Sequence, residues 1–230
     1  MQITKRYIYP PRPVHDPVPF DKIGMFRRYG WKCQIKVNDL RTEFSIENGR
    51  VEFFTRHATP HKRDIPDYIP AEILKVCEKL GFGTSEWVYL DGGLLQHKNK
   101  HLSGLVAIWD ILVVKGDYLL GTTYQSRYDL LAKSCEPFIV IINGKSFDIG
   151  LKLTEHIFVP RIYNDFDAAW SLVREVNTAA GWSEKTGGEP CLEGLVMKQM
   201  DAKLEPDLGR EKNNNSWSAR SRVCTKRHHF

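Results

Sequence analysis

The chain has 230 residues, of which 42% are hydrophobic and 27% charged, and its 33 lysines and arginines against 28 aspartates and glutamates give a formal net charge of +5. This length and hydrophobic content suit one domain with its own core, and no apolar run approaches the roughly 20 residues of a membrane span. Composition therefore excludes a membrane protein, a disulfide-stapled mini-protein and a long multidomain chain. The positive charge is compatible with a phosphate-bearing partner but proves none.

Proline and cysteine usage divides the chain and indicates its compartment. Residues 1–20 hold five of the twelve prolines, which predicts an extended N-terminal arm, followed by one domain at 21–230 with a basic C-terminal tail. The five cysteines stand singly without a C-x-x-C pair, so we expect free thiols and no zinc site. Because the N-terminus lacks a signal-peptide pattern, we expect a cytoplasmic location. We also expect a monomer.

Apolar alternation and turn residues, taken in chain order, predict an α+β domain dominated by antiparallel strands. Asn48-Gly49 and Asn143-Gly144 each separate two alternating segments, a pattern typical of tight β-hairpins. Helical spacing predicts helices at 70–80, ending at Gly81, and at 126–133 and 167–176. Strands are predicted at residues 33–37, 44–46, 51–53, 87–95, 105–114, 138–142, 146–153 and 192–198.

The last predicted strand carries charge at both ends of an apolar run. Alternate residues of a half-buried strand share a face, so Glu193 is expected beside Leu195 on one face. Lys198 is expected beside Val196 on the other face. A charged pair around such a run indicates a ligand-binding floor rather than a plain core strand. Lys36, on the polar face of the first strand, would by itself be an ordinary exposed lysine.

Two motifs resemble the signatures of the covalent nucleotidyltransferases, the family of ATP-dependent DNA ligases, RNA ligases and mRNA capping guanylyltransferases. Lys36-x-Asn38-Asp39-x-Arg41 is similar to the family's K-x-(D/N/H)-G-x-(R/N/S), and Glu193 to Lys198 is similar to E-G, three hydrophobic residues and K. Further motifs follow in the family's order across about residues 30–227. They are Phe54-Thr55-Arg56, Leu90-Asp91-Gly92-Gly93-Leu94-Leu95, Ile108-Trp109-Asp110-Ile111-Leu112 with Gly121, Arg127 and Leu131, and Glu205-Pro206-Asp207-Leu208-Gly209-Arg210 before Trp217.

The resemblance implies an antiparallel-sheet-rich, ATP-grasp-like adenylation fold without a C-terminal OB domain, and ATP with Mg²⁺ (or Mn²⁺) as cofactors. It implies that Lys36 attacks the α-phosphate and carries AMP, with Glu193 and Lys198 as catalytic partners and Glu193 and Asp91 as metal ligands. Since an ordinary lysine has a pKa of about 10.4, the attacking amine needs nearby cations and partial burial to become neutral. The implied nucleotide-binding residues are Asn38, Arg41, Arg56, Asp91, Trp109, Leu195, Val196, Arg220 and Arg222.

Three departures from the family pattern bear on the site. Asp39 replaces a glycine, at a turn where a left-handed residue is expected. Gly93 replaces a glutamate that contacts ribose or metal in the family, and Asp91 is the nearest substitute. In the tail, Arg220 and Arg222 stand where the family has lysines at a different spacing.

The implied substrate is a nucleic acid with 5′-phosphate and 3′-hydroxyl ends, with DNA nick sealing slightly favoured over RNA joining. The residues expected to contact its phosphates are Lys98, Lys100, Arg220, Arg222, Lys226 and Arg227. With no room for an oligonucleotide-binding barrel after the tail, we expect a minimal phage or viral ligase in the host cytoplasm, or a separate clamp or OB-type partner. An RNA ligase, a capping-type guanylyltransferase and a non-catalytic nucleotide- or nucleic-acid-binding relic remain alternatives, and Gly93 favours the last.

Overall fold

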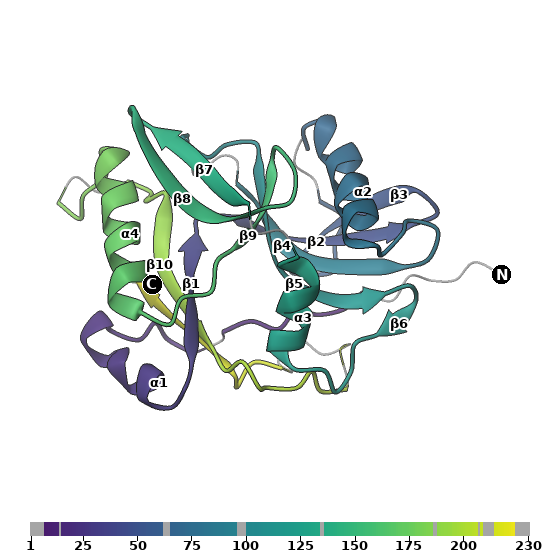
Figure 1. Ribbon diagram of the computed structural model, residues 1–230, viewed down its shortest axis with the longest axis horizontal. Coiled ribbons are helices and arrows are strands. Elements are labelled where there is room, and N and C mark those ends of the chain that lie inside the picture. Colours follow the sequence, from purple (N-terminus) through teal and green to yellow (C-terminus); the bar gives the residue numbers. More distant parts are fainter. Residues whose placement is uncertain are drawn as a thin grey trace.

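The computed structural model describes residues 7–13, 15–61, 65–95, 100–133, 136–185, 188–206, 208 and 214–223. These residues form an α+β fold in which a three-stranded sheet lies beside an eight-stranded sheet (Figure 1). Antiparallel strand pairs dominate both sheets, as predicted. No helix in the described part of the chain is long and apolar enough to cross a membrane.

The small sheet brings together strands from the beginning and the end of the chain. Its antiparallel strands, in the order β1-β10-β11, are β1 (Lys32–Val37), β10 (Leu192–Lys198) and β11 (Ser218–Arg222). Helix α4 (Phe166–Ala179) lies against β1 and β10 (Figure 1), and its first turn is capped by the Asp165 carboxylate. Ile35, Leu195 and Met197 are buried in the cluster beneath it.

The large sheet has the strand order β3-β2-β4-β5-β9-β8-β7, with the short β6 paired to β5. Among the pairs described, β5 and β9 alone run parallel. Its strands are β2 (Leu40–Glu47), β3 (Arg50–Thr55), β4 (Val88–Leu95), β5 (Leu105–Val114), β6 (Asp117–Tyr118), β7 (Pro137–Ile142), β8 (Lys145–Lys152) and β9 (Ile157–Pro160). The other helices are η1 (Phe20–Lys22), α1 (Gly24–Arg28), α2 (Tyr68–Leu80) and α3 (Tyr124–Leu131).

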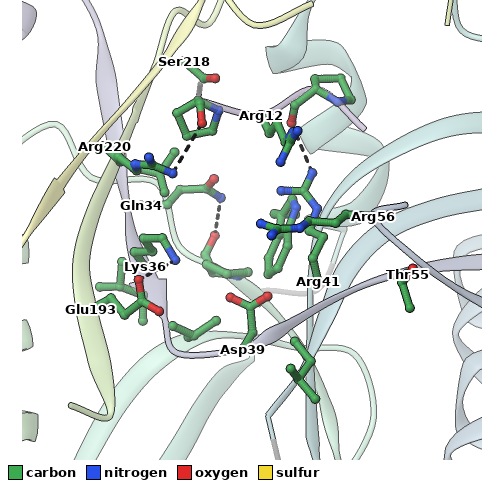
Figure 2. A pocket seen from close by; sticks show the side chains of 18 of the residues that line it. Arg12, Gln34, Lys36, Asp39, Arg41, Thr55, Arg56, Glu193, Ser218 and Arg220 are labelled. Atoms are coloured by element: carbon green, nitrogen blue, oxygen red, sulfur yellow. Dashed lines mark hydrogen bonds and ion pairs between the residues drawn. The ribbon is translucent and has the colours of Figure 1, made fainter. Parts of the chain in front are cut away.

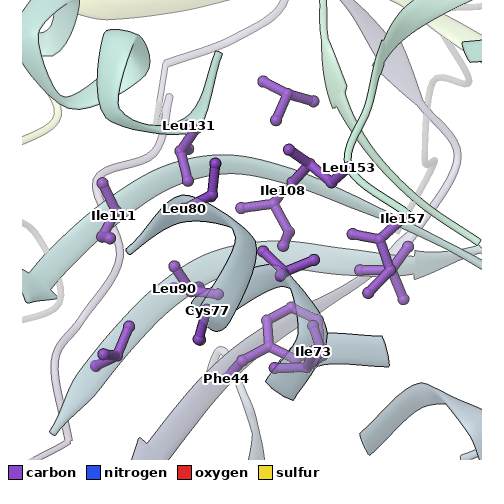
Figure 3. Packing of buried hydrophobic residues seen from close by; sticks show 14 of the residues in the cluster. Phe44, Ile73, Cys77, Leu80, Leu90, Ile108, Ile111, Leu131, Leu153 and Ile157 are labelled. Carbon is purple, nitrogen blue, oxygen red and sulfur yellow. The ribbon is translucent and has the colours of Figure 1, made fainter. Parts of the chain in front are cut away.

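Helix α2 packs its apolar side on the large sheet. Ile73 and Cys77, one turn apart, are fully buried in the same cluster as Phe44 of β2 and Leu90 of β4 (Figure 3). Gly81 ends the helix at a φ of 77°, which confirms the predicted left-handed cap. This packing fixes the position of β2 and β4, and β2 reaches the cavity described below through Leu40 and Arg41.

The two Asn-Gly hairpins are confirmed. Asn48 and Gly49 have φ values of 49° and 68°, and Asn143 and Gly144 have 47° and 79°. Two consecutive left-handed residues define the type I′ turn, whose twist matches that of the flanking strands. The predicted strands and helices are all present, with ends that differ by a few residues.

Strands β6, β9 and β11 and the short helices η1 and α1 were not predicted. Strand β11 reads Ser-Ala-Arg-Ser-Arg and lacks apolar alternation, but its backbone pairs with β10 and buries Ser218 and Ser221. Strand β9 has four residues and pairs in parallel with β5, a long-range contact that no local pattern encodes. Both strands complete the walls of the cavity.

Candidate active site

A cavity of about 550 Å³ opens between the two sheets (Figure 2). This volume lies within the roughly 300–1,000 Å³ typical of small-ligand sites. Its described lining contains two acidic residues, Asp39 and Glu193. The basic residues that line it are Arg12, Lys36, Arg41, Arg56, Lys198, Arg220 and Arg222. This excess of cations suits a ligand that carries phosphate groups.

Lys36 and Glu193 form an ion pair at the cavity wall. Lys36 Nζ lies 2.9 Å from Glu193 Oε2, and Arg222 Nε lies 3.2 Å from the same oxygen. The antiparallel register of β1 and β10 places Lys36 opposite Gly194, which brings the first and last motifs together. Both side chains of the pair keep almost a fifth of their surface exposed, 18% and 17%. The pair is therefore accessible to a ligand.

Glu193 lies on a different side of β10 than strict alternation predicts. It lines the cavity with Val196 and Lys198, whereas Leu195 is fully buried in the core. The cause is a local irregularity: Gly194 has a φ of 142°, and the pairing with β1 shifts register next to Lys36. A Cβ at position 194 would overlap the backbone of β11, so only glycine fits there. The predicted placement of Glu193 and Lys198 on opposite faces of the strand is therefore wrong.

Lys198 is buried at the cavity floor beside helix α3. Its Nζ donates a hydrogen bond of 2.6 Å to the Tyr124 hydroxyl and lies 3.9 Å from the centre of that ring. Burial lowers the pKa of Lys198 to about 7, against the opposing effect of Asp110 and Asp91. Lys198 can therefore change its charge near neutral pH, which the sequence did not reveal.

Arg41 is held by a buried acidic network on the large sheet. Its Nη2 donates to Asp91 Oδ2 and, at 3.1 Å, to the Pro11 carbonyl, and its Nε lies 3.5 Å from Glu43 Oε1. Asp91 and Glu43 are fully buried, and burial raises the pKa of Asp91 to about 6. The guanidinium also lies 5.1 Å from the centre of the Trp109 ring. Arg41 is thus bound by buried carboxylates, and its guanidinium covers one face of Trp109.

The remaining predicted residues fall into three groups. Asn38 is buried, and its amide donates to Glu189 Oε2 at 3.1 Å and to the Pro190 carbonyl at 3.0 Å, so it holds the chain before β10 rather than lining the cavity. Arg56 is exposed at the cavity rim, while Lys100 is exposed away from the cavity. Lys98, Lys226 and Arg227 lie outside the described residues.

Several residues that line the cavity were not predicted as site residues, among them Arg12, Gln34 and Asp39. Gln34 donates to the Pro160 carbonyl at 2.7 Å and accepts from the Tyr124 hydroxyl at 2.9 Å, so it links both sheets to helix α3. Its position two residues before Lys36 puts it on the same strand face, a signal that alternation could have supplied. No comparable signal existed for Arg12, because nothing local places the arm across the cavity.

The donor set fits a divalent cation that also binds phosphate. Among the described residues no three His, Cys, Asp or Glu side chains gather to hold a metal by themselves. Mg²⁺ is commonly held by one or two carboxylates together with substrate phosphates, and Glu193 supplies a carboxylate at the cavity wall. Asp91, the other predicted ligand, is fully buried on Arg41 and does not line the cavity.

This arrangement of sheets is similar to the fold of solved DNA ligase structures. It matches mycobacterial DNA ligase D complexed with ATP and MES at a TM-score of 0.52 and 17% identity, covering 95% of this chain and 61% of that one. It also matches the ligase domain of LigD from M. tuberculosis at 0.52 and 18%, covering 87% and 56%. The chain spans less than two thirds of either structure, and the likeness is one of fold. No family model and no curated relative matches the sequence.

Proposed function

We propose that the chain is an ATP-dependent polynucleotide ligase, which forms lysyl-AMP on Lys36 and joins a 5′-phosphate to a 3′-hydroxyl. The observation that carries this proposal is the meeting of Lys36, Glu193 and Lys198 in one cationic cavity of nucleotide size. The motifs that supply them are distant in sequence and are joined by the β1–β10 pairing. DNA nick sealing is the favoured reaction and RNA joining the alternative.

Lys36 is placed to act as the nucleophile. Its neutral amine attacks the α-phosphorus of ATP, so that a P–N bond forms while the P–O bond to pyrophosphate breaks. Glu193 Oε2, 2.9 Å from Nζ, is positioned to take the proton that the amine loses. With Glu193 as its protein ligand, Mg²⁺ or Mn²⁺ supplies positive charge that offsets the charge of the departing pyrophosphate.

The other cations of the cavity have separate tasks. Lys198, as an ammonium, donates hydrogen bonds to a phosphate oxygen in the transition state, and its pKa of about 7 lets it release that proton afterwards. Arg41 is held by the buried carboxylates of Asp91 and Glu43, so the phosphate contacts fall to Arg56, Arg220 and Arg222, which line the cavity and are less buried. Trp109 and Val196 supply apolar surface for the base.

Two further transfers complete the proposed reaction. An oxygen of the nucleic-acid 5′-phosphate attacks the AMP phosphorus, the P–N bond breaks, and Lys36 regains a proton. The 3′-hydroxyl oxygen then attacks the 5′-phosphorus, forms the phosphodiester, loses its proton and releases AMP. The proposal includes a cytoplasmic monomer and a separate clamp or OB-type partner that holds the duplex.

The first step is tested by weighing the protein after incubation with ATP and Mg²⁺. We expect a gain of one AMP that is lost in Lys36→Ala and kept in Lys32→Ala, whose lysine lies on the same strand but does not line the cavity. No adduct, with nucleic-acid binding retained, would establish the non-catalytic alternative. An adduct from GTP alone would indicate a capping-type enzyme.

The substrate is tested once the adduct is observed. Nicked DNA and nicked RNA duplexes, each with a 5′-phosphate at the nick, are compared for sealing by the adenylated protein. Faster sealing of DNA supports the favoured reaction, and faster sealing of RNA replaces it with the alternative. Sealing by the isolated chain without any added protein would rule out an obligatory clamp.

A further inference from the structure

Gly93 is a glycine because Asp39 occupies the space beside it. Gly93 of β4 pairs with Arg41 of β2, so a side chain at position 93 would project on the same side of the sheet as Arg41. A Cβ there would lie 2.8 Å from both Cβ and Cγ of Asp39, and closer still to Oδ2. Gly93 has no left-handed φ, so the position requires glycine for space and not for backbone freedom.

Asp39 is the other half of this contact and opens into the cavity. Its carboxylate lies between Lys36 and Arg41, and it is drawn toward the centre of the site (Figure 2). Asp39 is not among the described non-glycine residues with positive φ, so the left-handed turn expected there is absent and an aspartate fits without strain. No ion pair joins its carboxylate to a described residue, whereas the Glu193 carboxylate is paired with Lys36 and Arg222.

We propose that the two departures at positions 39 and 93 are one exchange, in which Asp39 supplies the carboxylate that binds the sugar hydroxyls of the nucleotide. The inference rests on the proposed function. The carboxylate that the resemblance places on β4 has moved to the turn before β2, and Gly93 has lost its side chain to make room. With Asp39 in this role, the site lacks none of the carboxylates of the family motifs. Gly93 in place of a glutamate then no longer favours a non-catalytic relic.

The position of Asp39 favours sugar over metal. In ATP the ribose is attached directly to the α-phosphate, and Lys36 fixes where that phosphate must lie, so the wall beside Lys36 faces the sugar. A carboxylate only accepts hydrogen bonds, and its two oxygens match the two hydroxyl donors of a ribose.

The first test compares adduct formation from ATP with that from 2′-deoxyATP and 3′-deoxyATP. Losing a hydrogen bond to a charged acceptor costs about 1.5–3 kcal/mol, so we expect wild type to prefer ATP by roughly 10–150-fold over at least one deoxy analogue. Asp39→Ala is expected to bring that ratio close to one, because the alanine has no acceptor. An adduct from wild type with an unchanged ratio in Asp39→Ala overturns this inference and leaves the ligase proposal standing. An unchanged ratio with a raised Mg²⁺ requirement makes Asp39 a metal ligand instead, and also overturns it.

The second test is a double-mutant cycle at the two positions. Gly93→Glu alone is expected to lose at least about 10-fold in adduct formation, since its side chain overlaps Asp39, and Asp39→Gly alone loses the preference for ATP. The double variant Asp39→Gly/Gly93→Glu is expected to recover both rate and preference. A double variant no better than the product of the singles contradicts the exchange. If the double variant fails to fold, judged by its unfolding transition, the ratio in Asp39→Ala decides the matter alone.

Discussion

Two ion pairs, one on the small sheet and one against the large sheet, differ in how far they are exposed to solvent. On the small sheet, Lys36 and Glu193 meet at a partly exposed cavity wall, with 18% and 17% of their side-chain surfaces accessible. Between helix α3 and strand β5 of the large sheet, Arg127 and Asp110 are almost completely buried, with 0% and 2% accessible, and form two hydrogen bonds of 2.8 and 3.1 Å. An accessible pair can exchange its partner for a phosphate, whereas a buried pair fixes the wall against which the ligand binds.

Lys198 joins the two regions. It belongs to β10 of the small sheet, but its amine reaches Tyr124 of helix α3, which packs on β5 of the large sheet. The Tyr124 hydroxyl oxygen also lies 2.8 Å from the Trp109 carbonyl oxygen, an alternative acceptor for its one hydrogen. Lys198, together with Gln34, therefore connects the small sheet to helix α3 and the large sheet. We therefore expect substitutions on the small sheet to impair the reaction and substitution of the buried pair to lower stability. Substitution of Lys198 should change how stability depends on pH.

The largest effect is expected at Lys36. Lys36→Arg keeps the positive charge and the ion pair with Glu193, but a guanidinium stays protonated and cannot attack phosphorus. We therefore expect complete loss of the AMP adduct in mass spectra, with an unfolding midpoint close to that of wild type. Lys32→Arg on the same strand is the matched control and is expected to form the adduct normally. An adduct on Lys36→Arg would place the nucleophile elsewhere and break the assignment of chemistry to the small sheet.

The next largest effect is expected from splitting the buried pair of the large sheet. Arg127→Met leaves Asp110 buried without its partner, which should lower the free energy of unfolding by about 3–5 kcal/mol in urea titrations. The double variant Arg127→Met/Asp110→Leu removes both charges and is expected to regain most of that loss. A single variant within about 1 kcal/mol of wild type would show that the buried pair does not stabilise this wall.

Much of this architecture could be predicted from the sequence because its signals are local. Asn48-Gly49 and Gly81 encode their turns by backbone conformation, and the apolar alternation of β1 follows from a two-sided strand. The order of the motifs brought Lys36 and Glu193 into one hypothesis, and the structure places them 2.9 Å apart.

The rest depends on contacts between distant residues. Neither the fully buried state of Asp91 nor the irregularity at Gly194 follows from its neighbours in sequence, since both are set by strands that pair across the sheet. The same holds for the link between Asp39 and Gly93, which lie on different elements. Taken singly, Asp39 and Gly93 each depart from the family motif without a reason, and their proximity in the structure accounts for both departures.

A smaller effect, and one that depends on pH, is expected from Lys198. Its pKa is about 7 in the folded protein and 10.5 as an ordinary lysine, so between these values the unfolded state binds more protons than the folded state. The free energy of unfolding should therefore rise with pH across this window, by up to about 1.4 kcal/mol per pH unit from this group. Lys198→Met lacks the titrating amine, so the difference between wild type and variant isolates the slope. Urea titrations at pH 7, 8 and 9 measure it, and a difference that stays constant would contradict the burial of a titratable amine between the sheets.

The smallest effect is expected from an ion pair that belongs to neither cavity wall. Arg27 of α1 lies 3.4 Å from Asp167 of α4, with 54% and 72% of the side chains exposed. Water and salt screen such a pair, so Arg27→Gln should change the free energy of unfolding by less than about 1 kcal/mol and leave adduct formation unchanged. Urea titrations of Arg27→Gln and Arg127→Met in the same buffer then compare an exposed and a buried arginine directly. Equal losses in the two variants would show that burial does not set the strength of ion pairs here, and the contrast between the two sheets would lose its physical basis.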